Sequence, residues 1–350
     1  MTAPFLELVD LASERLGGSV IAANDEFFAP KENLIKIAPP IWREGEYTER
    51  GKWMDGWETR RRRDTGDHDW CIIRLGAPAI VHGVNVDTTH FKGNYPEACA
   101  IDGCNLAGLP AIDDVVRARW REIIVRTPLT GDTHNPIAVD GGPRVLSERG
   151  ERTATHLRLR IFPDGGVARL RVYGEVVADW PRLARQGDVD LAAAEHGGLV
   201  VACSDMFFGS RHNLIMPGDA THMGDGWETR RRRGPGHDWT IVRLGAKGTI
   251  RRVEIDTRHF KGNAPGACSL DACASDEPLV LEQSRAPWTE LLPRTPLQPD
   301  ARHAFEAELR SIGDVTHVRF NIYPDGGVGR LRLFGRPRHP GAGAVRGNPR

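Results

Sequence analysis

The segment LRLRIFPDGGVARLRV, residues 157–172, carries the pattern that decides the fold. Leu157, Leu159 and Ile161 alternate with charged residues, and the same alternation returns after the Pro-Asp-Gly-Gly turn. Successive side chains on a β-strand point to opposite faces, so a period of two is typical of a strand with one buried face. Two such runs separated by a turn rich in Pro, Asp and Gly predict a β-hairpin.

The pattern belongs to a repeat that spans most of the chain. FPDGG at 162–166 returns as YPDGG at 323–327, an offset of 161 (323 − 162). DGWETRRRR at 55–63 returns unchanged at 225–233, an offset of 170 (225 − 55). Length changes therefore fall between the motifs, where loops tolerate them. We predict two copies of one domain, at residues 4–178 and 187–336. A linker at 179–186 joins them, and a disordered tail follows at 337–350.

Other segments indicate the same class of fold. The apolar residues at 71–73 and 80–86 predict two further strands, as do their partners at 241–242 and 250–255. Helix is predicted only for 5–16 and 189–196, because each of these segments ends at a Gly-Gly pair. Short strands with Gly, Pro and Asp turns in a domain of about 150 residues favour a β-sandwich. We predict an all-β chain, a tandem repeat of two jelly-roll domains.

Composition limits the classes of function. A chain of 350 residues that is 40% hydrophobic can bury two cores. Its 47 basic and 47 acidic residues balance, so neither nucleic acid nor a membrane is expected as a partner. We see no signal peptide and no apolar run of membrane-spanning length, and expect a cytoplasmic protein. Six cysteines are too few for a disulfide scaffold and are expected to be reduced.

The repeated DGWETRRRR segment is the densest polar group in each copy. On a strand, Glu58 would lie on the face opposite Trp57, which is a large apolar anchor. The simplest interpretation of the arginines is a solvated basic edge. The functional interpretation is a planar clamp for a carboxylate or ureido group, which Arg suits better than Lys. The candidate binding residues are Arg60, Arg61, Arg62, Arg230, Arg231 and Arg232.

Two further repeated clusters supply groups for proton transfer. HDW at 68–70 precedes a predicted strand, DTTHFKGN at 87–94 follows one, and their counterparts lie at 237–239 and 256–263. One such histidine is more often structural than catalytic, but the matching sets in both copies suit a small polar substrate. The candidate catalytic residues are Glu58, His68, Asp69, Asp87, His90, Glu228, His237, Asp238, Asp256 and His259. The remaining binding candidates are Lys92, Asn94, Lys261 and Asn263.

Other kinds of site are less consistent with the sequence. Cys99 and Cys104, like Cys268 and Cys273, are five residues apart, but a zinc site would need a second ligand pair nearby. Buried thiols are favoured, and we predict no metal and no cofactor. The chain also lacks a Gly-x-Ser-x-Gly elbow, a His-Glu-x-x-His motif and a phosphate-binding loop.

In this order, and present twice, the motifs resemble the allantoicase (allantoate amidinohydrolase) family. The resemblance rests on DGWETRRRR, HDW, DT-x-HFKGN and F/Y-PDGGV and covers both repeats. It implies tandem jelly rolls similar to galactose-binding-like domains, a homo-oligomer, and hydrolysis of allantoate to (S)-ureidoglycolate and urea in purine degradation through allantoin. Two differences separate the copies. Arg258 replaces Thr89, and the first copy has ten more residues (180 − 170) between its FF and DGWE motifs.

The chemistry of allantoate fits these residues. Its carboxylate and two ureido groups need a cationic partner and several amide-matching donors, and loss of urea needs an acid and a base. We assign proton transfer to His90 or His68 with Asp69, Asp87 or Glu58, and to their partners. Two other classes remain open, a non-catalytic module for carbohydrate or another small ligand and a metal-dependent ureohydrolase. Whether each repeat holds a site or the repeats share one also remains open.

Overall fold

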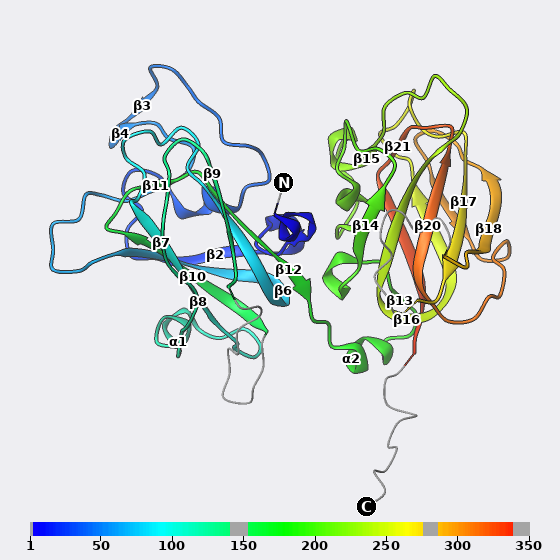
Figure 1. The fold of residues 1–350 in the computed structure, drawn as a ribbon, viewed down its shortest axis with the longest axis horizontal. Coiled ribbons are helices and arrows are strands. Elements are labelled where there is room, and N and C mark those ends of the chain that lie inside the picture. The colour runs from blue at the N-terminus through cyan, green and yellow to red at the C-terminus, as the bar shows by residue number, and fades with distance from the viewer. Residues whose placement is uncertain (1–2, 141–152, 276–285, 339–350) are drawn as a thin grey trace, which may run out of the picture. The chain divides into compact units, whose positions relative to one another are not determined.

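The computed structural model describes residues 3–140, 153–275 and 286–338. The chain divides into two compact units, Met1–Val177 and Ala178–Arg350, each built mainly of strands (Figure 1). The strands of the first unit are β1 Val9–Asp10, β2 Ser19–Ala23, β3 Tyr47–Thr48, β4 Gly51–Lys52, β5 Trp57–Glu58, β6 Asp69–Asp87, β7 Ala98–Cys104, β8 Arg121–Pro128, β9 His134–Ala138, β10 Ala154–Phe162, β11 Gly166–Val167 and β12 Arg169–Val176. Those of the second unit are β13 Val189–Asp190, β14 Leu199–Cys203, β15 Trp227–Glu228, β16 Asp238–Asp256, β17 Ala267–Cys273, β18 Thr289–Pro296, β19 Arg302–Phe305, β20 Val315–Tyr323, β21 Gly327–Val328 and β22 Arg330–Pro337.

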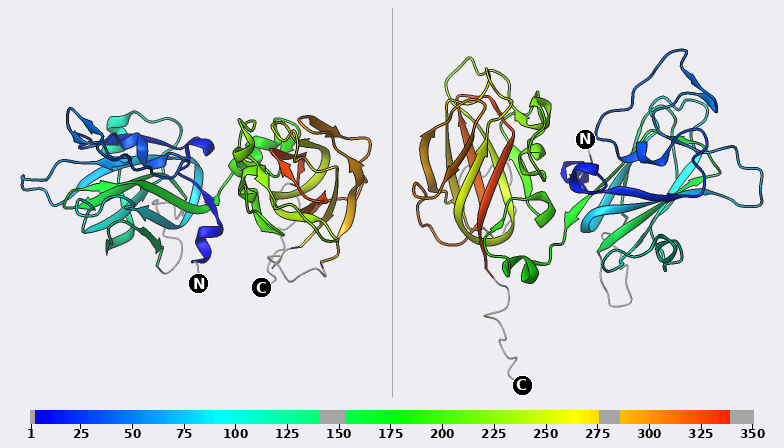
Figure 2. Two further views of the ribbon diagram at one scale, coloured as in Figure 1. Left: turned by 90° about the horizontal axis from the view of Figure 1, so that it is seen from above. Right: turned by 180° about the vertical axis from the view of Figure 1, so that it is seen from behind.

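One long strand organises each unit. The part of β6 up to Arg74 pairs with β2 and β10, whereas the part from Ala79 onward pairs mainly with β12 and β9. The complete order is β1-β12-β6-β10-β7-β8, and the second unit repeats it as β13-β22-β16-β20-β17-β18. By changing partners along its length, β6 contributes to both layers of strands around one core. Figure 2 shows the strands of each unit from two further sides.

The all-β prediction is confirmed, and the architecture is a tandem pair of jelly-roll units. The hairpin prediction for 157–172 is wrong, because β10 and β12 each pair with β6, which lies between them. The turn leads instead into β11, which pairs with β5. The segments at 71–73 and 80–86 also form one continuous strand. Alternation reports a buried face but does not say which strand lies alongside.

The helix predictions for 5–16 and 189–196 are wrong except for single turns. The first segment contains the 3₁₀ turns η1 Pro4–Glu7 and η2 Glu14–Leu16 with β1 between them, and the second contains β13 and η4 Ala194–His196. Asp10 favours the strand, because its Oδ1 accepts a hydrogen bond from the backbone of Val172 on β12 (3.0 Å). The predicted glycine stops are present, since Gly17 and Gly197 have φ of 96° and 91°.

The other helices are short. They are η3 Lys31–Ile35, α1 Ile112–Val116, α2 Trp180–Ala184, η5 Arg211–Ile215 and η6 Met223–Asp225. Among the described residues, no helix is long and apolar enough to span a membrane. The helix α2 lies within the predicted linker, and the predicted tail from residue 339 onward lies outside the described residues.

The core contains the side chains that the alternation placed inside. Leu157, Leu159 and Ile161 are fully buried, and Trp57 and Trp227 are the largest buried side chains of their units. The prediction of buried thiols is also confirmed for Cys99, Cys104, Cys268 and Cys273. Burial raises the pKa of the Cys99 thiol to about 12.

Candidate active site

Glu58 is held at one edge of the first unit by the short strand β5. Its neighbour Trp57 is fully buried, and the indole Nε1 donates a hydrogen bond to the backbone oxygen of Asp25 (2.8 Å). Side chains alternate along a strand, so the buried Trp57 directs Glu58 to the opposite face. The backbone of Glu58 pairs with Ala29 on one side and Gly166 on the other. These pairings fix the backbone from which the carboxyl group extends.

Asn94 contacts this carboxyl group directly. Its Nδ2 donates a hydrogen bond to Oε1 of Glu58 (2.7 Å), and its backbone oxygen accepts one from the amide of Gly166 (2.7 Å). Burial raises the pKa of Glu58 above its usual value, although the bond from Asn94 acts in the opposite direction. A carboxyl group with a raised pKa is suited to proton transfer, because it keeps its proton to higher pH.

His90 has an unusual backbone conformation that fixes its ring. Its φ is 72°, in the left-handed region, and its amide donates to Oδ1 of Asp132 (2.8 Å). Residues other than Gly seldom adopt this conformation, and such strain is concentrated at functional sites. The ring Nε2 lies 3.3 Å from the backbone oxygen of Pro40. A carbonyl oxygen can only accept, so Nε2 carries the proton and Nδ1 of the neutral ring remains a proton acceptor.

Glu58, His90, Lys92 and Asn94 line a single pocket of about 450 Å³. The other lining residues are Phe28, Trp42, Lys52, Met54 and Gly93. Trp42 and Lys52 were not candidates from the sequence. Both belong to the longer segment between the FF and DGWE motifs, which is the signal that could have found them. An insertion present in one repeat only, and placed next to the repeated motifs, is a candidate for a specialised site.

The second unit repeats the central contacts. Asn263 Nδ2 donates to Glu228 Oε1 (2.6 Å), and His259 has a φ of 72°. The ring Nε2 of His259 lies 2.9 Å from the backbone oxygen of Ala220. Lys261 occupies the position that Lys92 has in the first unit, and its Nζ lies 3.9 Å from a carboxylate oxygen, as does that of Lys92.

The two units differ in the segment that faces these residues. Residues 36–54 connect η3 to the DGWE motif in the first unit, whereas residues 216–224 make the corresponding connection in the second. In the shorter connection, Asp219 forms ion pairs with Arg258 (3.0 Å) and Arg302 (2.5 Å). The second unit therefore has no counterpart of Trp42 among these residues, and His222 stands where Lys52 does, three residues before the DGWE motif.

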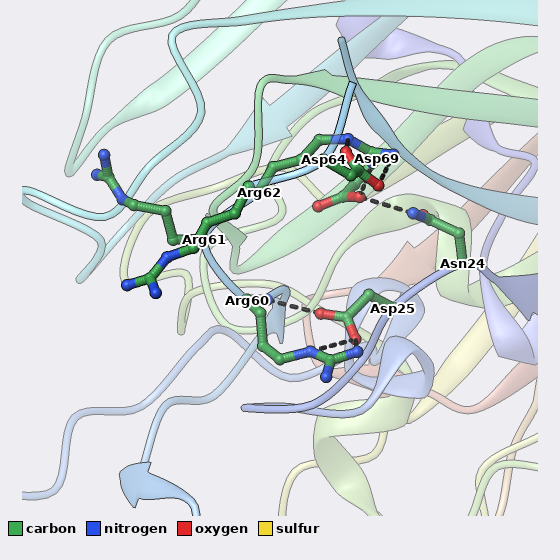
Figure 3. A pocket seen from close by; sticks show the side chains of 8 residues that line it. Asn24, Asp25, Arg60, Arg61, Arg62, Asp64 and Asp69 are labelled. Carbon is green, nitrogen blue, oxygen red and sulfur yellow. Dashed lines mark hydrogen bonds and ion pairs between the residues drawn. The ribbon is translucent and has the colours of Figure 1, made fainter. Parts of the chain in front are cut away.

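The arginine run lines a different pocket, of about 290 Å³, which Figure 3 shows from close by. The guanidinium of Arg60 donates twice to Oδ1 of Asp25 (3.1 and 2.8 Å). Arg62 pairs with the buried carboxylate of Asp69. The side chain of Arg61 extends away from both ion pairs in Figure 3. In the second unit Arg232 likewise pairs with Asp238, while Arg230 lies 3.9 Å from Asp205 and Arg231 is exposed.

The other catalytic candidates lie outside the Glu58 pocket. His68 and Asp69 have separate partners. His68 Nδ1 lies 2.5 Å from Asp67 Oδ1, and Asp69 Oδ1 accepts a hydrogen bond from Asn24 (2.6 Å). Asp87 accepts from the amide and hydroxyl of Thr89 (2.9 and 2.5 Å). Their counterparts are also engaged elsewhere: His237 with Asn321 (3.2 Å), Asp238 with Ser204 (2.9 Å) and Asp256 with Arg258 (2.5 Å).

The fold is that of a duplicated β-sandwich protein, and Glu58, His90, Lys92 and Asn94 bring polar groups together in one pocket of its first unit. The family model described as Allantoicase repeat matches residues 9–177 and 189–338. A probable allantoicase of Pseudomonas aeruginosa strain LESB58 is 49% identical over 342 residues, which cover 97% of this chain and 98% of the relative. A probable allantoicase of Streptomyces coelicolor is 45% identical over 97% of this chain and 88% of the relative. The crystal structure of allantoicase from Saccharomyces cerevisiae has a TM-score of 0.77 at 35% identity and covers 93% of this chain and 92% of its own.

The chain belongs to the allantoicase family. It is accordingly a hydrolase that acts on allantoate in purine degradation. The resemblance inferred from the sequence motifs is confirmed.

Proposed function

We propose that the chain hydrolyses allantoate to ureidoglycolate and urea in the Glu58 pocket of the first unit. The observation that carries this proposal is the shared pocket. Glu58, with its raised pKa, and His90, with its proton-accepting Nδ1, line the same pocket, together with Asn94 and Lys92. An acid and a base on one substrate are what the release of urea requires.

The polar groups of the pocket match those of the substrate. Allantoate carries a carboxylate and two ureido groups on one carbon atom. The side-chain amide of Asn94 donates a hydrogen bond to Glu58 through Nδ2. This bond holds the Glu58 carboxyl group in the orientation in which it faces the substrate. Phe28, Trp42 and Met54 add apolar surface beside these polar groups.

The reaction can be written with Glu58 as acid and His90 as base. Glu58 gives its proton to the ureido nitrogen bound to the central carbon, and the electron pair of the breaking C–N bond goes to that nitrogen. Water forms the new C–O bond, and His90 Nδ1 takes its proton. The products are urea and ureidoglycolate. A proton then returns from His90 to Glu58 through solvent, which restores both groups. Each proton transfer contributes roughly 10²–10⁴-fold to the rate.

The first unit is favoured because its pocket includes the longer segment 36–54. This segment supplies Trp42, Lys52 and the Pro40 oxygen that fixes His90. The second unit has the Glu228–Asn263 pair but only the shorter, ion-paired connection across from it. We therefore assign the two copies different roles.

A urea-release assay with a matched pair of variants tests the proposal. Glu58→Gln keeps the shape and the hydrogen bond from Asn94 but removes the transferable proton, so its kcat should fall by roughly 10²–10⁴-fold. Glu228→Gln makes the same change in the second unit and should keep near wild-type activity. Equal losses in the two variants would contradict assignment to the first unit.

The same assay separates the other classes of function. Wild-type protein that binds allantoate but releases no urea would indicate a non-catalytic module. Activity that disappears after chelation and returns with a divalent ion would indicate a metal-dependent reaction, and steps written without a metal would then be wrong.

We also propose that the protein is a homo-oligomer. Met206, Phe207 and Phe208 are 45%, 59% and 61% exposed, and contiguous apolar surface of this kind marks interfaces. In the first unit the corresponding Phe28 is half-buried, and the ring lies beside Gly51 of the β3–β4 hairpin. Sedimentation equilibrium should show a mass above one chain, and Phe207→Ser/Phe208→Ser should reduce it. A wild-type monomer would contradict the proposal.

We place the protein in the cytoplasm, where thiols stay reduced. Support comes from the thiols of Cys71, Cys99, Cys104, Cys268 and Cys273, which are buried and free in the structure. Intact-mass measurement of protein from cell extract, with thiols blocked at lysis, should give the fully reduced mass. A mass lower by one or more hydrogen pairs would contradict this placement.

A further inference from the structure

The inserted segment of the first unit brings a cation, Lys52, and an aromatic ring, Trp42, to the lining of the Glu58 pocket. Lys52 is the last residue of β4, and its Nζ lies 3.9 Å from the centroid of the Trp42 ring. The indole Nε1 of Trp42 donates to Glu44 (2.8 Å), and its ring centroid lies 5.7 Å from that of His90. Trp42 therefore connects Lys52 to the proposed base.

The cations of the pocket and of the arginine run differ in their counter-ions. Arg60 and Arg62 are paired with Asp25 and Asp69, and Lys92 faces Asp132 at 3.9 Å. Lys52 has no carboxylate within ion-pair distance in the described part of the chain, although it lines the pocket. An ammonium group in contact with only a ring face keeps its hydrogen-bond donors for an anion.

We propose that Lys52, held on Trp42, binds the carboxylate of the substrate and thereby gives the first unit its specificity for a carboxylate-bearing ureide. This inference rests on the proposed function of the pocket. With the carboxylate at Lys52, the ureido groups of the same carbon extend toward Asn94 and Glu58, which line the same pocket. The second unit, with His222 in place of Lys52 and no counterpart of Trp42 in residues 216–224, lacks this clamp.

Methylenediurea, which is allantoate with hydrogen in place of the carboxylate, separates this role from a structural one. The variant Lys52→Met keeps the aliphatic contact with Trp42 and removes the charge. It should lower kcat/KM for allantoate by on the order of 10- to 100-fold, while the inhibition constant of methylenediurea stays unchanged. Lys52→Arg should recover part of the loss. The control is Arg43→Met, on the same segment but paired with Glu46 outside the pocket, and it should behave as wild type.

Binding of allantoate to inactive protein distinguishes this inference from the proposed reaction. Calorimetry should show that Glu58→Gln/Lys52→Met binds allantoate on the order of 10- to 100-fold more weakly than Glu58→Gln does. The two variants should bind methylenediurea equally well. If wild-type protein binds allantoate without turnover, the proposed reaction fails and this comparison still tests Lys52. Unchanged affinity in the double variant, or equal weakening of allantoate and methylenediurea, overturns the assignment of Lys52.

Discussion

Glu58 combines a fixed position in the fold with a shifted pKa. Its backbone is paired on both sides, its carboxyl group is bonded to Asn94, and burial raises its pKa. Because we assign it as the acid, the protonated form is the active one. We predict that kcat/KM falls as pH rises through the pKa of Glu58, and that this alkaline limb is absent from the residual activity of Glu58→Gln. A pH–rate profile of the two proteins checks this, and an unchanged limb in the variant would assign it to another group.

The same raised pKa predicts an effect on stability. A carboxyl group with a higher pKa in the folded than in the unfolded state stabilises the fold while it is protonated. That stabilisation is complete below the unfolded pKa and is lost as pH rises through the folded pKa. Glutamine stays neutral at every pH. At pH values above the folded pKa of Glu58, the Glu58→Gln variant should therefore unfold at an equal or higher temperature than wild type. Thermal melts of the two proteins at acidic and alkaline pH measure the difference in unfolding temperature. A variant less stable than wild type at alkaline pH would mean that the charged form of Glu58 does not destabilise the fold.

The buried thiols should be chemically inert in the native protein. Burial raises the pKa of Cys99, Cys104 and Cys268 to about 12, and only the thiolate reacts with alkylating agents. Iodoacetamide at mildly alkaline pH should label these cysteines only after denaturant is added, as peptide mass spectrometry can show. Rapid labelling of the native protein would mean that these strands open readily.

At the scale of elements, the pairing of β5 with β11, and that of β15 with β21 in the second unit, depends on close packing. A Cβ added to Gly166 would lie 1.9 Å from the Phe91 ring, and one added to Gly327 would lie 2.0 Å from the Phe260 ring. Overpacking of this kind costs about 1–3 kcal/mol. We predict that Gly166→Ala and Gly327→Ala both lower the unfolding temperature.

The two glycine variants should differ in activity. Gly166 pairs directly with Glu58, so Gly166→Ala should also reduce urea release, whereas Gly327→Ala should affect mainly stability. Gly262→Ala, with no atom within 4 Å of the added Cβ, is a control that should match wild type in both measurements. Equal activity of the Gly166 and Gly327 variants at a temperature where both are folded would contradict the coupling of β11 to the site.

At the scale of the whole molecule, the question is why the motifs occur twice. His90 and His259 share the left-handed backbone and the bond from Nε2 to a loop carbonyl. We predict that His90→Ala loses roughly 10²–10⁴-fold in kcat, while His259→Ala keeps most of the activity. Urea release by the two single variants measures this. Half the activity from each would indicate two independent sites, and near-complete loss from each would indicate one composite site.

The strands, the duplication and part of the candidate site could be predicted from the sequence. The period of two identified the strands, because a strand with one buried face imposes it on any chain. The exact repeat of DGWETRRRR fixed the duplication, and four candidates, Glu58, His90, Lys92 and Asn94, do share a pocket. The burial of Trp57 beside an outward Glu58 also followed from alternation.

Tertiary structure alone decided which strands are neighbours and which polar groups meet. Local pattern cannot report that β6 lies between β10 and β12, because pairing depends on residues far apart in the chain. For the same reason it could not show that Asp25 and Asp69 neutralise Arg60 and Arg62. A charge run looks alike in sequence whether its counter-ions are a substrate or the protein's own carboxylates. The structure makes that distinction, because an ion pair is defined by distance in space.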